Sequence, residues 1–197
     1  MRIIITLFLS ILFLNCNKKE GKAFFNQSEI TVEHHIKDSL AFELCAMFGL
    51  DQGIRDKEIF SLLGKTSRNI DTLSFNRLVK FIKTYGYPNK ELVGEKNWEH
   101  ECVGAAAMAI MLHNPHRLVN ESEYLNLFLG EVEKGNMKRE FLATVLDKHY
   151  WSRSRGEKVL YGSAFGTPCL QTKEETNAAR EKIGLLPLED SEFKNCE

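Results

Sequence analysis

Apolar residues recur at three- and four-residue steps over most of the chain, a period that predicts amphipathic helices. The longest such segment spans about 35–63, where Ile36, Leu40, Leu44 and Met47 share one face. Gly53 interrupts it, at a cost of about 1 kcal/mol relative to alanine. Further helices are predicted over about 72–84, 95–113, 120–134, 136–151 and 173–183.

The predicted helix over 95–113 differs from the others because residues 102–112 carry no charge. A helix that is apolar on every side is buried on every side, so this one is expected at the centre of a bundle. Residues 17–33 are polar without a sustained period and are interpreted as a tether, and residues 64–71 as a linker.

Local signals refine the second half of the chain. Asn120, followed three residues later by Glu123, predicts a capping box at a helix start. Phe141 is expected to face inward. Glycine and proline make most of 152–171 a loop, within which residues 158–161 have the composition of a short strand. The predicted fold is mainly α, a single-domain irregular helical bundle around a buried central helix. It carries a Gly-rich loop near the C-terminus, where a short strand pair is left open.

An apolar run also occupies residues 3–14, behind Arg2. A membrane-spanning helix needs about 20 apolar residues, so these twelve fit the hydrophobic region of an export signal. The run ends at Leu14-Asn15-Cys16, which resembles the lipobox of bacterial lipoproteins. That resemblance implies cleavage before Cys16 and acylation of this cysteine, such as with palmitate. An ordinary secretory signal with a chance cysteine is the alternative.

These segments give three predicted divisions: a signal peptide over 1–15, a lipid anchor and polar tether over 16–34, and a helical domain over 35–197. The predicted location is the cell envelope, with the membrane as a partner through lipidated Cys16. Asn17 is not the aspartate that resembles an inner-membrane retention signal, which favours the outer membrane. The 26 basic and 27 acidic residues are spread along the chain, which argues against a nucleic-acid partner.

Four cysteines remain behind Cys16. In an oxidising compartment they can form two disulfides, with three possible connectivities. Cys169 lies in the Gly-rich loop and Cys196 near the end of the sequence, so both suit crosslinks. Cys45 and Cys102 lie in apolar helical patterns that also fit buried thiols. The cysteine spacing is not that of a zinc site, and no metal or cofactor is predicted.

Several polar residues are candidates for chemistry. Asp51 and Arg55 are four apart and share a helix face, which also fits a plain surface ion pair. His113 ends the apolar helix, where it can act in acid–base chemistry or only cap the helix. Asp147 lies among apolar neighbours. Tyr161 opens a glycine loop that lacks the spacing of a phosphate-binding loop or a nucleophile elbow.

The order of short motifs resembles that of a bacterial family known only as a domain of unknown function. The motifs are Asp51-Gln52-x-x-Arg55, Gly86-Tyr87-Pro88 with Val93-Gly94, His113, Leu142-Ala143 with Asp147, Tyr161-Gly162, and Asn177-x-x-Arg180 with Ile183-Gly184-Leu185. The resemblance covers about 40–190 and implies a helical, often exported domain. It implies a polar set of Asp51, Gln52, Arg55, His113, Asp147, Tyr161 and Arg180.

The chain departs from that family pattern at three places. Lys148 stands where the family has arginine, Pro115 where it has an acidic residue, and Ser163-Ala164 where it has Thr-Gln. Lysine does not reproduce the bidentate geometry of arginine. These departures favour a non-catalytic envelope module that binds or scaffolds a small molecule or an envelope protein.

The alternative is an envelope hydrolase or lyase acting on a small molecule or glycan. In that hypothesis His113 is the acid–base, Asp51 or Asp147 orients it, and Tyr161 donates a proton. Gln52, Arg55 and Arg180 would contact the ligand.

Overall fold

The computed structural model describes residues 20–196; the predicted export signal and Cys16 lie outside the described residues. The α-helices are α1 (Glu20–Gly53), α2 (Lys57–Leu63), α3 (Thr66–Tyr85), α4 (Lys90–Val93), α5 (Glu95–Trp98), α6 (Glu101–Gly104), α7 (Ala106–His113), α8 (Pro115–Asn120), α9 (Ser122–Glu133), α10 (Arg139–Arg153) and α11 (Lys173–Lys182). Two 3-10 turns follow, η1 (Leu170–Thr172) and η2 (Asp190–Glu192).

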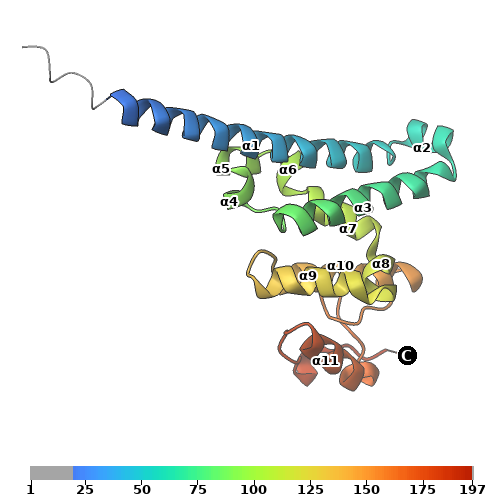
Figure 1. Cartoon of the computed structure of the whole chain (residues 1–197). Coiled ribbons are helices and arrows are strands. Elements are labelled where there is room, and N and C mark those ends of the chain that lie inside the picture. The colour runs from blue at the N-terminus through green and yellow to red at the C-terminus, as the bar shows by residue number, and fades with distance from the viewer. Residues whose placement is uncertain (1–19, 197) are drawn as a thin grey trace, which may run out of the picture.

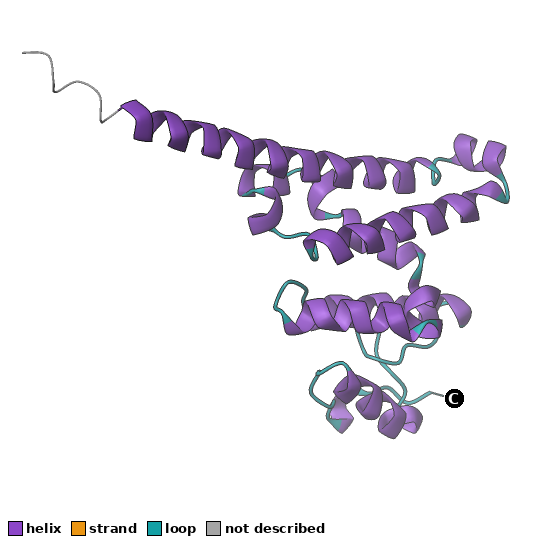
Figure 2. Cartoon of the chain, viewed as in Figure 1, coloured by secondary structure: helices purple, strands orange, loops and turns teal. Residues whose placement is uncertain are grey.

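The helices are stacked in layers (Figure 1). Helix α1 lies along one side and its N-terminal part extends past the helices packed beneath it. Helices α3 and α7 form the next layer, α8 to α10 the one after, and α11 lies farthest from α1. Figure 2 shows helices and loops only in the described part of the chain, which confirms the predicted mainly α fold. No helix within residues 20–196 combines the length and apolar character needed to cross a bilayer.

The core lies where α7 meets α1, α3 and α10. Ile110 and Met111 of α7 are fully buried, as are Phe75 of α3, Phe128 of α9 and Leu142 of α10. Burying a side chain of this size is worth about 1.5–3 kcal/mol. The apolar segment around residues 102–112 is therefore central, as its lack of charge predicted.

The prediction of one continuous helix over 95–113 was wrong, because α5, α6 and α7 divide this range. The chain leaves the helical conformation at His100, whose backbone is extended with φ −74° and ψ 126°, so α5 cannot continue into α6. The turn brings Gly104 close to α5, where an added Cβ would lie 3.1 Å from the carbonyl oxygen of Trp98. Only the last of the three helices, α7, has the length of two turns.

Other boundaries also differ from the sequence prediction. Helix α1 begins at Glu20, inside the segment interpreted as a tether, because residues 22–53 contain no proline to stop a helix. Helix α3 begins at Thr66, inside the expected linker. Asn120 ends α8 rather than capping α9, which begins without a side-chain cap. Phe141 is exposed, because it lies in the first turn of α10 ahead of the buried face.

The short strand considered at 158–161 does not form. The backbone N–H groups of Leu160 and Tyr161 donate to the carboxylate of Asp147 instead of to a neighbouring strand. Among the described residues the one β-bridge is isolated and joins Cys169 to Lys194.

Two disulfides crosslink the fold, Cys45–Cys102 and Cys169–Cys196. The second joins the pair that the sequence favoured for crosslinks. The first corrects the interpretation of Cys45 and Cys102 as buried thiols. Helices α1 and α6 pack side by side, which brings two residues 57 positions apart within bonding distance.

Removing the Cys45–Cys102 bond by Cys45→Ser with Cys102→Ser is expected to cost about 2–4 kcal/mol of unfolding free energy, because it frees a long loop in the unfolded chain. Urea unfolding followed by tryptophan fluorescence measures the loss. The control removes Cys169–Cys196, which closes a shorter loop of 27 residues and should cost less. Alkylation of Cys45 or Cys102 in denatured, unreduced protein would contradict the pairing.

Candidate functional site

A polar cluster joins α1, α3 and α7, and consists of Asp51, Arg55, Asp71 and His113. The Asp51 carboxylate has no exposed surface, and its oxygens lie 3.0 and 2.8 Å from Nδ1 of His113. Arg55 donates to Asp51 at 3.3 Å and to Asp71 at 2.6 Å. Gln52 donates to Asp51 at 2.8 Å. We call these four residues with Gln52 the interhelical cluster.

The hydrogen bonds fix the tautomer of His113. A carboxylate only accepts hydrogen bonds and a guanidinium only donates them. The Nδ1–H of His113 therefore donates to Asp51. Nε of Arg55 lies 2.9 Å from Nε2 and 3.0 Å from Nδ1, so the guanidinium lies against the ring and is not directed at one nitrogen. The His113 side chain keeps 29% of its exposure, so the ring also borders solvent beside Arg55.

One side of the interhelical cluster is buried and the other is partly exposed to solvent. Asp51 is fully buried, whereas the side chains of His113 and Arg55 retain 29% and 28% of their exposure. A buried carboxylate is tolerated when cations and hydrogen-bond donors surround it, and each partner removed leaves it uncompensated. The arrangement fits a tie between three helices whose outer edge reaches solvent.

A second group holds the C-terminal loop. Asp147 of α10 is fully buried. One of its oxygens accepts the backbone N–H groups of Leu160 and Tyr161, both at 2.7 Å, and the other accepts that of Ser163 at 2.9 Å. The carboxylate thereby substitutes for the strand partner that the loop lacks.

Arg180 and Asn177 of α11 complete this second group through the backbone. Arg180 donates to the carbonyl oxygens of Tyr161 and Leu186. Asn177 binds Leu188 through both its amide nitrogen and its oxygen. Burial raises the pKa of the Tyr161 phenol, and the neighbouring Tyr150 and Asp147 side chains add to the shift. A phenol of that kind stays protonated and is a weak proton donor.

The seven polar residues singled out from the sequence thus separate into two groups. Asp51, Gln52, Arg55 and His113 meet in the interhelical cluster, while Asp147, Tyr161 and Arg180 meet around the loop. Within residues 20–196 no hydrogen bond or ion pair connects the groups. The family resemblance implied one polar set, and the structure divides its members between two places in the fold.

Two acidic residues were missed by sequence analysis. Asp71 completes the interhelical cluster from a segment that was interpreted as a linker. Glu131 is buried and accepts the backbone N–H of Tyr87 at 2.8 Å, which holds the Gly86-Tyr87-Pro88 turn. Burial would raise the pKa of Glu131, but hydrogen bonds from Lys134, Asn136 and Tyr87 outweigh it and lower the pKa. A polar residue at a core position of a helix was the available signal for Glu131.

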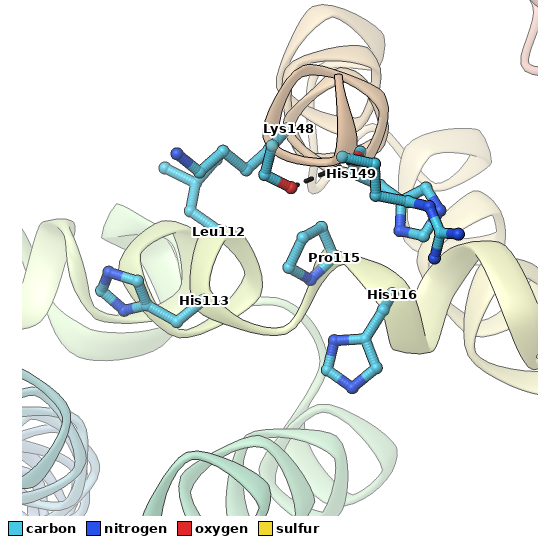
Figure 3. Close-up of a pocket in the computed structure, with 8 residues that line it drawn as sticks. Leu112, His113, Pro115, His116, Lys148 and His149 are labelled. Atoms are coloured by element: carbon cyan, nitrogen blue, oxygen red, sulfur yellow. Dashed lines mark hydrogen bonds between the residues drawn. The ribbon is translucent and has the colours of Figure 1, made fainter. Parts of the chain in front are cut away.

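A pocket of about 350 Å³ lies between the α7–α8 junction and the last turns of α10. It is lined by Leu112, His113, Pro115, His116, Lys148, His149, Ser152 and Arg153. Figure 3 shows the ring of His113 turned away from those of His116 and His149. The interhelical cluster and the pocket therefore meet along α7 but are directed to different sides.

No family model, curated protein or solved structure matches this chain. Among the described residues, no three His, Cys, Asp or Glu side chains are placed to hold a metal ion together. The two polar groups and the pocket are accordingly interpreted from their own geometry.

Replacing Asp147 by alanine is expected to lower the unfolding free energy by about 3 kcal/mol or more, because three backbone N–H groups lose their acceptor. Urea unfolding measures the loss. The matched control is Glu140→Ala, an exposed acid on the same helix, which should cost less than about 1 kcal/mol. Equal losses in the two variants would contradict the role assigned to Asp147.

Proposed function

We propose that this chain is a lipid-anchored, non-catalytic binding module of a bacterial cell envelope. The observation that carries the proposal is the environment of His113, whose Nδ1–H donates to the buried Asp51 carboxylate and whose ring lies against the guanidinium of Arg55. A general acid–base needs a ring nitrogen within reach of its substrate. In this structure His113 instead connects α7 to α1 through Asp51.

The other candidate residues support the same proposal. Asp147 and Arg180 bind backbone groups, and the Tyr161 phenol is buried and holds its proton tightly. The environment of each of these three candidate residues is therefore explained by a role in holding the fold together. Such a scaffold keeps its surface and its pocket free for binding a small molecule or an envelope protein.

The proposed location in the cell envelope rests on the sequence and on the disulfides. The apolar run over 3–14 followed by Cys16 suits export and acylation, and two acyl chains on Cys16, with a third on the new amine, would hold the chain stably at a membrane. Disulfides persist in oxidising compartments and are rare in the cytosol. Two of them in this fold fit an envelope location, with the outer membrane favoured by Asn17.

A second candidate is an envelope hydrolase or lyase. The contact that favours it is the 2.8 Å separation between Nδ1 of His113 and Asp51, which orients the ring as a carboxylate orients a general base. Arg55 would then have to leave Nε2 and bind an anionic group of the substrate.

Lipidation is tested at Cys16. The full chain, expressed in a bacterial host fed radiolabelled palmitate, is expected to incorporate label and to sediment with membranes. Cys16→Ser should abolish the label, because the thiol is the acyl acceptor. Cys196→Ser is the matched control and should keep it. Absence of label from the unaltered chain, or label in Cys16→Ser, would refute the anchor.

The role of His113 is tested by its replacement. His113→Ala is expected to lower the unfolding free energy by about 2–4 kcal/mol, because the buried Asp51 carboxylate loses a hydrogen-bond donor that contacts both of its oxygens. His100→Ala is the control, an exposed histidine without a side-chain contact in the described chain, and should cost less than about 0.5 kcal/mol. Unchanged stability in His113→Ala would refute the structural role and favour the enzyme.

A further inference from the structure

The pocket beside α7 contains basic side chains and no carboxylate. Two of its eight lining residues are committed elsewhere. His113 belongs to the interhelical cluster, and the Lys148 ammonium lies over the rings of Trp151, at 4.1 Å, and Phe165, at 5.1 Å. His116, His149 and Arg153 remain, while the Ser152 hydroxyl donates to the carbonyl oxygen of His149 at 3.1 Å.

The three basic groups form no side-chain hydrogen bond or ion pair within residues 20–196. His149 is 8% exposed, and its ring packs edge-on against that of Tyr150 at 5.3 Å between centroids. Its ring nitrogens are not among the buried polar atoms that lack a partner, so they border the pocket, where a ligand can reach them. His116 and Arg153 are exposed at the same pocket.

The three groups also act on one another. The pKa of His149 is lowered first by burial and then by the positive charges of Arg153 and His116. The nearby arginine Arg117 is not part of this set, because it pairs with Glu121 on the other side of α8. An anion placed among His116, His149 and Arg153 would remove the repulsion and supply the missing acceptors.

We propose that this pocket binds a phosphate group, either on a soluble phosphate ester or on a lipid headgroup. The inference rests on the proposed function of a binding module and names its ligand class. A tetrahedral oxyanion presents several acceptor oxygens in different directions, which suits donors that come from two helices, α8 and α10. The guanidinium of Arg153 offers a planar pair of donors to such an oxyanion. A volume of about 350 Å³ holds a phosphate with a small substituent.

The test is a calorimetric titration of the full chain in detergent micelles with inorganic phosphate. Arg153→Gln and His116→Gln are the test variants, since both residues are exposed and their loss leaves the core intact. Each should raise the dissociation constant about tenfold through the loss of a charge-assisted hydrogen bond. Arg68→Gln, an exposed arginine on α3, is the matched control and should change it less than about twofold.

Two competitors identify the source of the phosphate. Displacement by soluble glycerol phosphate supports a soluble ester, and displacement by phosphatidic acid in the same micelle supports a headgroup. The inference is overturned if the unaltered chain does not bind phosphate, or if Arg68→Gln weakens binding as much as the test variants do. It is also overturned if Arg153→Gln does not change binding, because phosphate is then an adventitious ion only. None of these results decides whether the chain is a binding module, which the His113 experiment tests separately. Hydrolysis of a phosphate ester that depends on His149 supports the site and refutes the non-catalytic proposal instead.

Discussion

The fold depends on the burial of one carboxylate. Asp51 lies at the end of α1 without contact to water, and a charge in that position must be compensated within the protein. Its partners come from other elements: His113 ends α7, and Arg55 extends the contact to Asp71 of α3. The ends of three helices are thereby fixed relative to each other, and the apolar faces of α3 and α7 meet in the register that buries Phe75 and Ile110.

Asp147 shows the same principle applied to a loop. Its three backbone donors replace a sheet, so a segment rich in glycine keeps a defined path without a strand partner. An aspartate, a histidine, an arginine and a tyrosine at the ends of elements are also the ingredients of many active sites. Here the contacts of each residue separate the two possibilities: partners that are backbone groups or other members of the same cluster indicate a structural role.

The period of apolar residues was sufficient to predict a helical bundle and its central segment, because the buried face of a helix requires apolar residues at three- and four-residue steps. The positions at which helices are interrupted could not be predicted in the same way. The predicted central helix is interrupted at His100, where the backbone is extended, and no glycine or proline at that position signals the break. Likewise Asp71 is an ordinary polar residue until α3 packs beside α1. Helix spacing predicted the pair of Asp51 and Arg55, whereas the family resemblance implied one polar set. The division of that set into two groups follows from tertiary packing that local sequence does not encode.

The path from the N-terminus into the fold has a mechanical consequence. Helix α1 extends beyond the helices that pack against it (Figure 1), and the Cys45–Cys102 bond joins its packed part to α6. A pull applied at residue 20 would travel along the helix and meet a covalent link at Cys45 before it reached Asp51. Part of the force would then pass through the disulfide into α6, which lowers the force that reaches the interhelical cluster.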